Sequence, residues 1–406
     1  MFWLLLKAKL SLVLSFLYFI TVPFEWHNPV GTYHLIHEAG YPMEAHTVIT
    51  EDGYIIEVHR IPWGRNEQGP GNKTRPAILL QHGLMLDSSN FISNLPEQSF
   101  GYILADAGYD VWLGNSRGNS FGRRHTRMTS WASSFWDFTW EEMAQFDIPA
   151  VVNKMLEVTG HSSIYYSGHS QGALTMMAWL SENPQHMDKV REMYLLAPAL
   201  ALNSVRGPIK DSMVVTPFLN VINNWLGTFG VFRRNPYNDV LRLICMWEWT
   251  GDFCAARYYA QGGAPSTQVN NSRLEIYMAS YPDGTSSKNF VHYSQMVYGE
   301  RTAKFDYGLE ENMKRYGRII IPSIDPRFLK STTVLHGYNH LDFNWGLRAA
   351  DDIYHPIIAL MDEDSKGESA VMQEVLERYS KKEESVLPSI EDSDAALLSL
   401  AAISSP

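Results

Sequence analysis

Hydrophobic residues in the first half of the chain follow two patterns that alternate along the sequence. Short runs that are apolar throughout are typical of strands buried on both faces, whereas longer segments with apolar residues at helical spacing are typical of amphipathic helices. The predicted strands are residues 77–81, 109–113, 163–167 and 192–196, and the predicted helices are residues 100–107, 139–159 and 173–182. Because the two kinds of element alternate with short connections, we predict an α/β fold in which helices cover both faces of a mostly parallel sheet.

The pattern changes further along the chain, and the changes suggest domain boundaries. Residues 26–200 form the first part of the predicted core, which begins with an alternating strand at 54–61. Residues 201–310 lose the alternation and are rich in aromatic residues and Met, so we interpret them as an inserted, mainly helical cap. Residues 311–361 return to the core, and residues 362–406 are acidic and Ser-rich, which predicts a disordered tail.

The N-terminus has the pattern of a secretory signal. Lys7 and Lys9 precede a run without charges at residues 10–22, which is shorter than the roughly 20 residues that a membrane-spanning helix needs. No cleavage site with small residues follows the run, so an uncleaved anchor or a buried helix are the alternatives. We take residues 1–25 as a signal peptide and predict entry into the secretory pathway.

Composition and charge exclude several classes of protein. The chain has 406 residues, 45% of them hydrophobic, and a net charge of -11 without a basic run, which argues against a nucleic-acid partner. Its two cysteines are too few for a disulfide framework or a four-cysteine zinc site. Cys245 and Cys254 could pair in an oxidising compartment or remain buried thiols. Asn72 and Asn270 begin triplets that can accept an N-linked glycan.

The strongest chemical signal is the sequence Gly168-His169-Ser170-Gln171-Gly172. It lies between a predicted strand and a predicted helix, and this context is typical of a nucleophilic serine on a sharp turn. The glycines two positions before and after Ser170 allow the strand and the helix to approach each other without a clash of Cβ atoms. We predict that Ser170 is a nucleophile.

A nucleophilic serine needs an oxyanion hole and a base. The first N–H of the hole should belong to Gln171, and the second should come from a loop after an earlier strand, where Leu84 follows the run at 77–81. The base should be a late histidine. His340 lies in a polar loop between a β-like run and a helix-like run, whereas His336 sits at the end of the run itself, so we prefer His340.

These residues and several longer motifs resemble the acid lipase family, which includes gastric lipase and lysosomal acid lipase. The resemblance extends from about Asn28 to Leu360. The motifs that carry it are GYPMEAHTVITEDGYIIEVHRIP, LLQHGL, ISNLPEQSFGYILADAGYDVWLGNSRGN, FWDFTWEEMAQFDIPA, GHSQG and YNHLDFNWGL.

The resemblance implies an α/β-hydrolase core with a cap and lid over the active site. It implies hydrolysis of triacylglycerols or cholesteryl esters at acidic pH without a metal or another cofactor, at a lipid–water interface, by a lysosomal or extracellular enzyme. Carried over by position, Ser170 is the nucleophile, His340 the base, and Leu84 and Gln171 the oxyanion donors. The spacing of Cys245 and Cys254 resembles a disulfide in the family's cap, and the triplet at Asn270 resembles a family glycosylation site.

One part of the family pattern is missing. Members carry a strand that ends in Gly-Gly-Asn-Asp, whose Asp is the triad acid, followed by an Ala-Asp-Pro segment. Only 32 residues separate Tyr307 from His340 here, and they contain no such stretch. In one interpretation Asp325 is the acid at the end of a shortened strand, although six residues are few for a crossover to the strand at 332–335, since a parallel crossover usually needs about a dozen.

In the other interpretation, which we favour, a strand and its helix have been lost from the chain. Asp306 and Asp342 are weaker candidates for the acid. Loss of the acid can lower kcat about 10⁴-fold. We therefore predict an active serine lipase or ester hydrolase, with an inactive lipase-like lipid-binding protein or a truncated isoform as the alternative.

Overall fold

A computed structural model describes residues 30–69, 71, 74–200, 202–206, 210–211, 213–299, 301–317, 331–366 and 399–404. The predicted signal peptide, the Asn72 triplet and Asp325 lie outside these residues. Among the described helices, none has the length and apolar character needed to cross a membrane.

In the described residues the core is one nine-stranded sheet with the order β1-β2-β4-β3-β6-β7-β11-β10, and β5 pairs with β2. Its strands are β1 (Glu44–Ile49), β2 (Tyr54–Ile61), β3 (Ala77–Gln81), β4 (Asp110–Leu113), β5 (Arg124–His125), β6 (Ile164–His169), β7 (Val190–Leu196), β10 (Ser331–Val334) and β11 (Ser399–Ser404). The four strands β4, β3, β6 and β7 are parallel, and β1 and β2 join them antiparallel. The predicted mostly parallel sheet is therefore confirmed.

Alternate residues of the central strands pack against helices on opposite faces of the sheet. On β3, Ile78 and Leu80 belong to one hydrophobic cluster and Ala77 and Leu79 to the other. The first cluster contains residues of α2 (Thr32–Glu38), α3 (Phe100–Asp106) and α15 (His355–Lys366), and the second contains residues of α5 (Ile148–Thr159) and α6 (Gln171–Glu182). Because side chains alternate between the faces of a strand, an apolar run is what a sheet covered on both faces requires.

The helix predicted at 139–159 is divided in the structure. Thr139 caps the short α4 (Trp140–Glu142), a π-helical turn follows at Met143–Asp147, and α5 ends at Gly160 in a left-handed conformation. Pro149 explains the break, because its ring has no N–H to donate to the carbonyl of Gln145 in a continuous α-helix.

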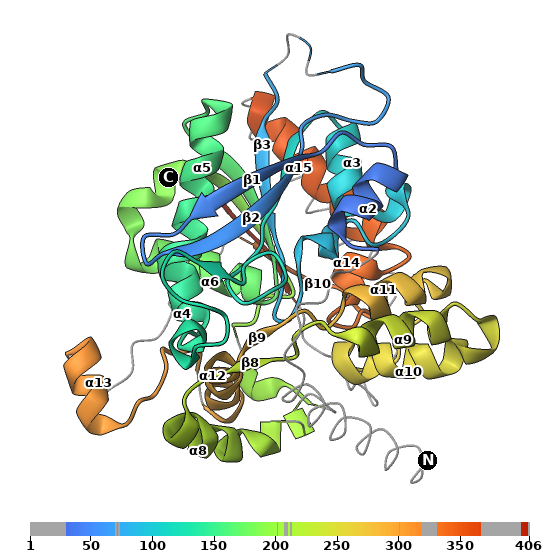
Figure 1. Ribbon diagram of the computed structural model, residues 1–406. Helices are drawn as coiled ribbons and strands as arrows, with labels where there is room; N and C mark the ends of the chain where they lie inside the picture. The colour runs from blue at the N-terminus through green and yellow to red at the C-terminus, as the bar shows by residue number, and fades with distance from the viewer. Residues whose placement is uncertain are drawn as a thin grey trace.

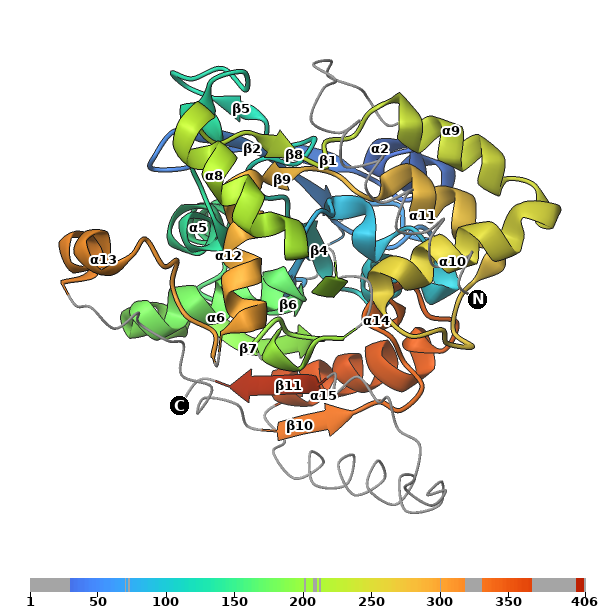
Figure 2. The ribbon, with the colours of Figure 1, turned by 90° about the horizontal axis from the view of Figure 1, so that it is seen from below.

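The predicted cap is helical in its described part, and all of its elements lie at one end of the sheet (Figure 1). They are α8 (Thr216–Leu226), α9 (Pro236–Cys245), α10 (Gly251–Gly262), α11 (Leu274–Ser280) and α12 (Ser287–Tyr298), with the small sheet of β8 (Gly230–Val231) and β9 (Thr285–Ser286). Beyond the predicted boundary, α13 (Leu309–Tyr316) stands apart from the sheet (Figure 1). Figure 2 views the molecule from this end, with α8 and α12 on one side and α9, α10 and α11 on the other.

Two segments of the predicted tail, residues 362–366 and 399–404, have regular secondary structure. Helix α15 continues to Lys366, and β11 lies between β7 and β10, antiparallel to both (Figure 2). Strand β10 is the strand that leads to His340, so a segment from the end of the chain fills the gap between it and β7. The backbone of β7 thus has a pairing partner on each side, β6 and β11.

We expect that Ala402→Pro destabilises the fold. Ala402 lies opposite Tyr194 of β7 and Ser331 of β10, so a proline there removes a ladder hydrogen bond and crowds a neighbouring strand. We expect a loss on the order of 2 kcal/mol in the free energy of unfolding, measured by urea denaturation. Ala396→Pro, which precedes the strand, is the matched control. Equal stability of the two variants would contradict this role of β11.

Candidate active site

Ser170 stands at a strained turn between β6 and α6. Its φ is 55° and its ψ is -112°, a backbone conformation that residues other than glycine rarely adopt. The turn is held by its own backbone, because the Ser170 N–H donates to the Leu196 carbonyl at 2.9 Å and its carbonyl accepts from Leu174 and Ala199. A nucleophilic serine held in this way is presented by the backbone, independently of flexible side chains.

The two glycines of the motif are required by close packing. A Cβ on Gly168 would lie 2.6 Å from the nitrogen of Ala173, and a Cβ on Gly172 would lie 2.3 Å from the carbonyl oxygen of Gln81 on β3. Both separations are shorter than real Cβ contacts. The Gly168 contact is the close approach of strand and helix that the motif predicted, and the Gly172 contact shows that the beginning of α6 also packs directly on the backbone of β3.

The loop after β3 passes close to Ser170. A Cβ on Gly83 would lie 3.0 Å from the Cβ of Ser170, so Leu84, the next residue, is close to the nucleophile. The following residue, Met85, has a φ of 59°, and its carbonyl accepts a hydrogen bond of 2.7 Å from the N–H of Asp283 in the cap. Gln171 begins α6, where N–H groups have no acceptor within the helix. This arrangement is compatible with the predicted oxyanion donors, Leu84 and Gln171.

The loop between β10 and α14 (Asp342–Trp345) carries His340, the predicted base, and places it against His169, the neighbour of Ser170. The ring of His340 lies 4.9 Å from the ring of His169, and the main-chain carbonyl of His340 is 2.9 Å from His169 Nε2. The His340 N–H donates to the Gly262 carbonyl of the cap at 2.8 Å. Burial lowers the pKa of His340 to about 4, so the ring is neutral at mildly acidic pH. His336, the alternative base, is exposed.

No carboxylate among the described residues hydrogen-bonds to the ring of His340. Asp342 accepts from the Asn339 N–H at 2.7 Å and from the Tyr258 hydroxyl at 2.8 Å, so it fixes the loop to α10 of the cap. Asp306 accepts from the Gly308 N–H and from Asn312 at the beginning of α13. Both weaker candidates for the acid are thus engaged elsewhere, and Asp325 lies outside the described residues.

Two further predictions concern the cap. Cys245 and Cys254 form a disulfide that joins the end of α9 to α10, which confirms the predicted pair. Asn270 is 7% exposed, and its amide nitrogen donates to Asn94 and Gln98 at 2.9 Å each. A glycan on this nitrogen would replace at least one of these bonds, and glycosylation of Asn270 stays a prediction.

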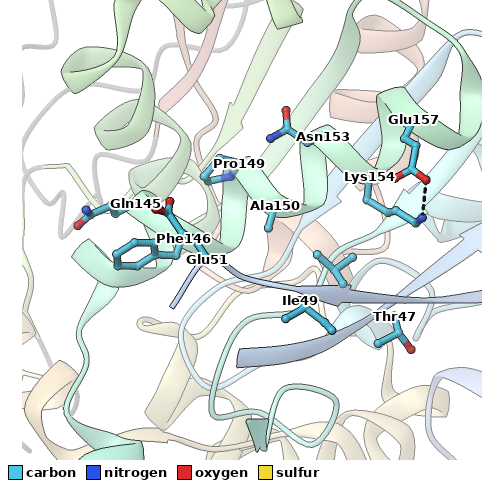
Figure 3. A pocket seen from close by; sticks show the side chains of 11 residues that line it. Thr47, Ile49, Glu51, Gln145, Phe146, Pro149, Ala150, Asn153, Lys154 and Glu157 are labelled. Carbon is cyan, nitrogen blue, oxygen red and sulfur yellow. Dashed lines mark hydrogen bonds and ion pairs between the residues drawn. The ribbon is translucent and has the colours of Figure 1, made fainter. Parts of the chain in front are cut away.

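A separate groove of about 510 Å³ lies between β1 and α5 (Figure 3). Its lining includes Ile49, Phe146 and Ala150, with an ion pair of 3.1 Å between Lys154 and Glu157 at one end. None of the predicted site residues lines this groove.

Sequence reasoning missed the contacts that hold the base in place. In the sequence, His169 occupies the variable position of the serine motif, and no motif singles out Gly262 or Tyr258. Their bonds join positions that are about 80 to 170 residues apart in the sequence, so no local pattern could have revealed them.

Two family models match the chain. The model of a partial α/β-hydrolase lipase region matches residues 32–95, and the model of the α/β-hydrolase fold matches residues 76–341. The chain is 39% identical to lipase lipl-1 of Caenorhabditis elegans over 364 residues, covering 80% of this chain and 89% of lipl-1. It is 33% identical to the gastric triacylglycerol lipase of Homo sapiens over 359 residues, covering 80% of this chain and 89% of that protein.

The alignments also indicate that residues are missing here. Coverage of 80% of 406 residues is about 325 residues, whereas the alignment with lipl-1 spans 364, so about 39 aligned positions have no counterpart in this chain. The same comparison with the human lipase gives about 34 positions. The loss of a strand and its helix before β10 stays a prediction.

The lowered pKa of His340 predicts how the reactivity of Ser170 depends on pH. A protonated His340 cannot accept the Ser170 proton, so reactivity should stay level from about pH 8 to pH 5 and fall tenfold per pH unit below the pKa of about 4. The measurement is the rate at which a 4-nitrophenyl phosphonate ester reacts with Ser170. His336→Gln should leave the profile unchanged and His340→Gln should abolish the reaction. An acid limb between pH 6 and 7 would contradict the lowered pKa.

Proposed function

The chain belongs to the α/β-hydrolase lipases, the family of gastric triacylglycerol lipase, and on this premise we propose that it hydrolyses carboxylic esters of lipids with Ser170 as the nucleophile. The observation that carries the proposal is the strained Ser170 turn, which lies beside the His340 loop. The proposed substrates are triacylglycerols or cholesteryl esters.

The proposed reaction has two steps that share one base. His340 accepts the hydroxyl proton of Ser170 as the oxygen attacks the ester carbonyl, and the N–H groups of Leu84 and Gln171 donate to the resulting oxyanion. The intermediate collapses, the ester C–O bond breaks, and the alcohol leaves with the proton from His340. Water then gives a proton to His340 and attacks the acyl-serine. The bond between the carbonyl carbon and Ser170 breaks as His340 returns that proton to the serine oxygen, which releases the fatty acid and restores the Ser170 hydroxyl.

Asp325 is the candidate acid of the shortened-strand interpretation, whereas in the lost-segment interpretation the residue that orients His340 is absent from the chain. Asp325 lies in the segment that leads into β10, the strand before the His340 loop. Asp342 and Asp306 are less suitable, because their carboxylates already accept hydrogen bonds from the loop and from α13.

Exposed apolar side chains of the cap form a surface that we assign to the lipid–water interface. One group, on α8 and the turn before it, is Val214, Phe218, Val221, Trp225 and Leu226. The other group, on α9, α10 and their connection, is Val240, Leu243, Met246, Trp247, Trp249 and Phe253. They lie on elements at opposite sides of the view in Figure 2, at the end of the molecule where the cap covers the sheet. Large exposed apolar patches on soluble proteins mark interaction surfaces.

The disulfide between Cys245 and Cys254 bears on two points: it restrains one part of this surface, and it indicates the compartment in which the protein folds. It closes the connection that carries Trp247 and Trp249, which are 63% and 82% exposed. A disulfide persists in an oxidising compartment, so it supports passage through the secretory pathway to the lysosome or the extracellular space.

The proposed activity is tested with 4-nitrophenyl butyrate, a soluble ester. We expect hydrolysis by the unmodified chain, a loss of about 10⁴-fold or more in Ser170→Ala, and a loss of about 10⁴-fold in Asp325→Asn if that residue orients the base. Circular dichroism checks that each variant is folded. Full activity of Asp325→Asn would exclude Asp325 as the acid. Equal rates for the unmodified chain and Ser170→Ala would overturn the proposed function and favour the inactive alternative.

The interface is tested with the double variant Trp247→Ser/Trp249→Ser. Because both indoles are exposed on the cap, we expect about a tenfold loss of activity on emulsified tributyrin and no change on the soluble ester. Ile49→Ser is the matched control, since it removes an apolar side chain that is 59% exposed on β1. A loss on both substrates, or an equal loss in Ile49→Ser, would contradict the assignment.

A further inference from the structure

His169 precedes the nucleophile and is completely buried. Its side chain extends from the Ser170 turn to the loop that carries His340, where Nε2 lies 2.9 Å from the main-chain oxygen of His340. The two imidazole rings are 4.9 Å apart. One residue thus connects the backbone that presents Ser170 with the backbone that presents His340.

The chemistry of this contact fixes the protonation state of His169. A carbonyl oxygen can only accept, so Nε2 must carry the proton and donate it. Burial and the nearby His340 lower the pKa of His169 well below its ordinary value, so the ring stays neutral at acidic pH. Nδ1 is buried without a hydrogen-bond partner among the described residues. The side chain therefore offers one donor, and it is directed at the His340 peptide.

The His340 peptide is held on both sides. Its N–H donates to the Gly262 carbonyl at 2.8 Å, and its carbonyl accepts from His169. The cap packs tightly here, because a Cβ on Gly262 would lie 2.9 Å from the side-chain oxygen of Asn339. No described carboxylate hydrogen-bonds to the His340 ring. Among the described residues, the position of the base therefore depends on these two main-chain hydrogen bonds.

We propose that His169 is a positioning residue for the base: its Nε2–H holds the His340 carbonyl and thereby sets the distance between the imidazole and Ser170. The inference rests on the proposed function, in which His340 takes the Ser170 proton. A displacement of about 1 Å in a catalytic group can cost about 100-fold in rate. The bond should therefore act on kcat, because it places the base.

The test compares two substitutions of the same residue. His169→Phe keeps a ring in the buried site but removes the donor, whereas His169→Gln places an amide N–H₂ near the position of Nε2. With 4-nitrophenyl butyrate we expect His169→Phe to lower kcat 10- to 100-fold with KM within twofold, and His169→Gln to recover most of kcat. A role in packing alone would not produce this difference.

His292 provides the matched control. It is also fully buried on α12, its Nε2 lies 2.9 Å from the Ala303 carbonyl, and its Nδ1 has no hydrogen-bond partner among the described residues. His292→Phe thus removes the same kind of bond away from His340, and we expect its kcat to stay within twofold of the unmodified chain. If His169→Phe does not fold, His169→Asn replaces it, because the shorter amide cannot reach the His340 carbonyl.

The outcomes separate this inference from the proposed function. If the unmodified chain is no more active than Ser170→Ala or His340→Ala, the proposed function fails. If those two variants are inactive but His169→Phe keeps its kcat, the positioning role is overturned and the proposed function stands. Equal losses in His169→Phe and His169→Gln would also overturn it, since the donor would then not matter.

Discussion

The close approach of three backbones beneath Ser170 is the constraint on which the rest of the site depends. Strand β6, the beginning of α6 and strand β3 pack at distances that no Cβ could enter, as the environment of Gly172 shows. This contact forces Ser170 into a left-handed conformation and places the loop of Leu84 next to it. The buried sheet compensates for that strain, because its central side chains are packed on both faces.

The base depends on the cap as well as on the core. His340 is bound by Gly262 through its N–H and by His169 through its carbonyl, while Asp342 joins the same loop to Tyr258 of α10. Ser170, the proposed nucleophile, is positioned by backbone geometry within one short segment. The loop of His340, the proposed base, is positioned by hydrogen bonds between segments that meet only in the folded chain.

Buried histidines and buried carboxyl groups change the free energy of unfolding in opposite directions as the pH changes. Burial lowers the pKa of His82 to about 4 and the pKa of His292 to about 3. The stability that these neutral histidines contribute to the folded state is therefore lost as the pH falls from 6.5 toward these values. Burial raises the pKa of Asp87 and Glu141 to about 7, so stability from these carboxyls is present at low pH and is lost as the pH rises through 7. Because the two pairs act in opposite directions between about pH 4 and 6.5, their effects on the free energy of unfolding partly cancel in that range.

The sequence by itself determined the local features of this protein: the alternating strands and helices, the serine turn with its two glycines, and the segment that becomes the helical cap. Each follows from a periodicity or from a steric requirement within a few residues, as at Gly168 and Gly172. The tertiary structure alone decided that β11, from a segment expected to be disordered, pairs with β7 and β10. It alone decided that His169 reaches His340. Both results depend on partners distant in the sequence, which are selected by the packing of the whole chain.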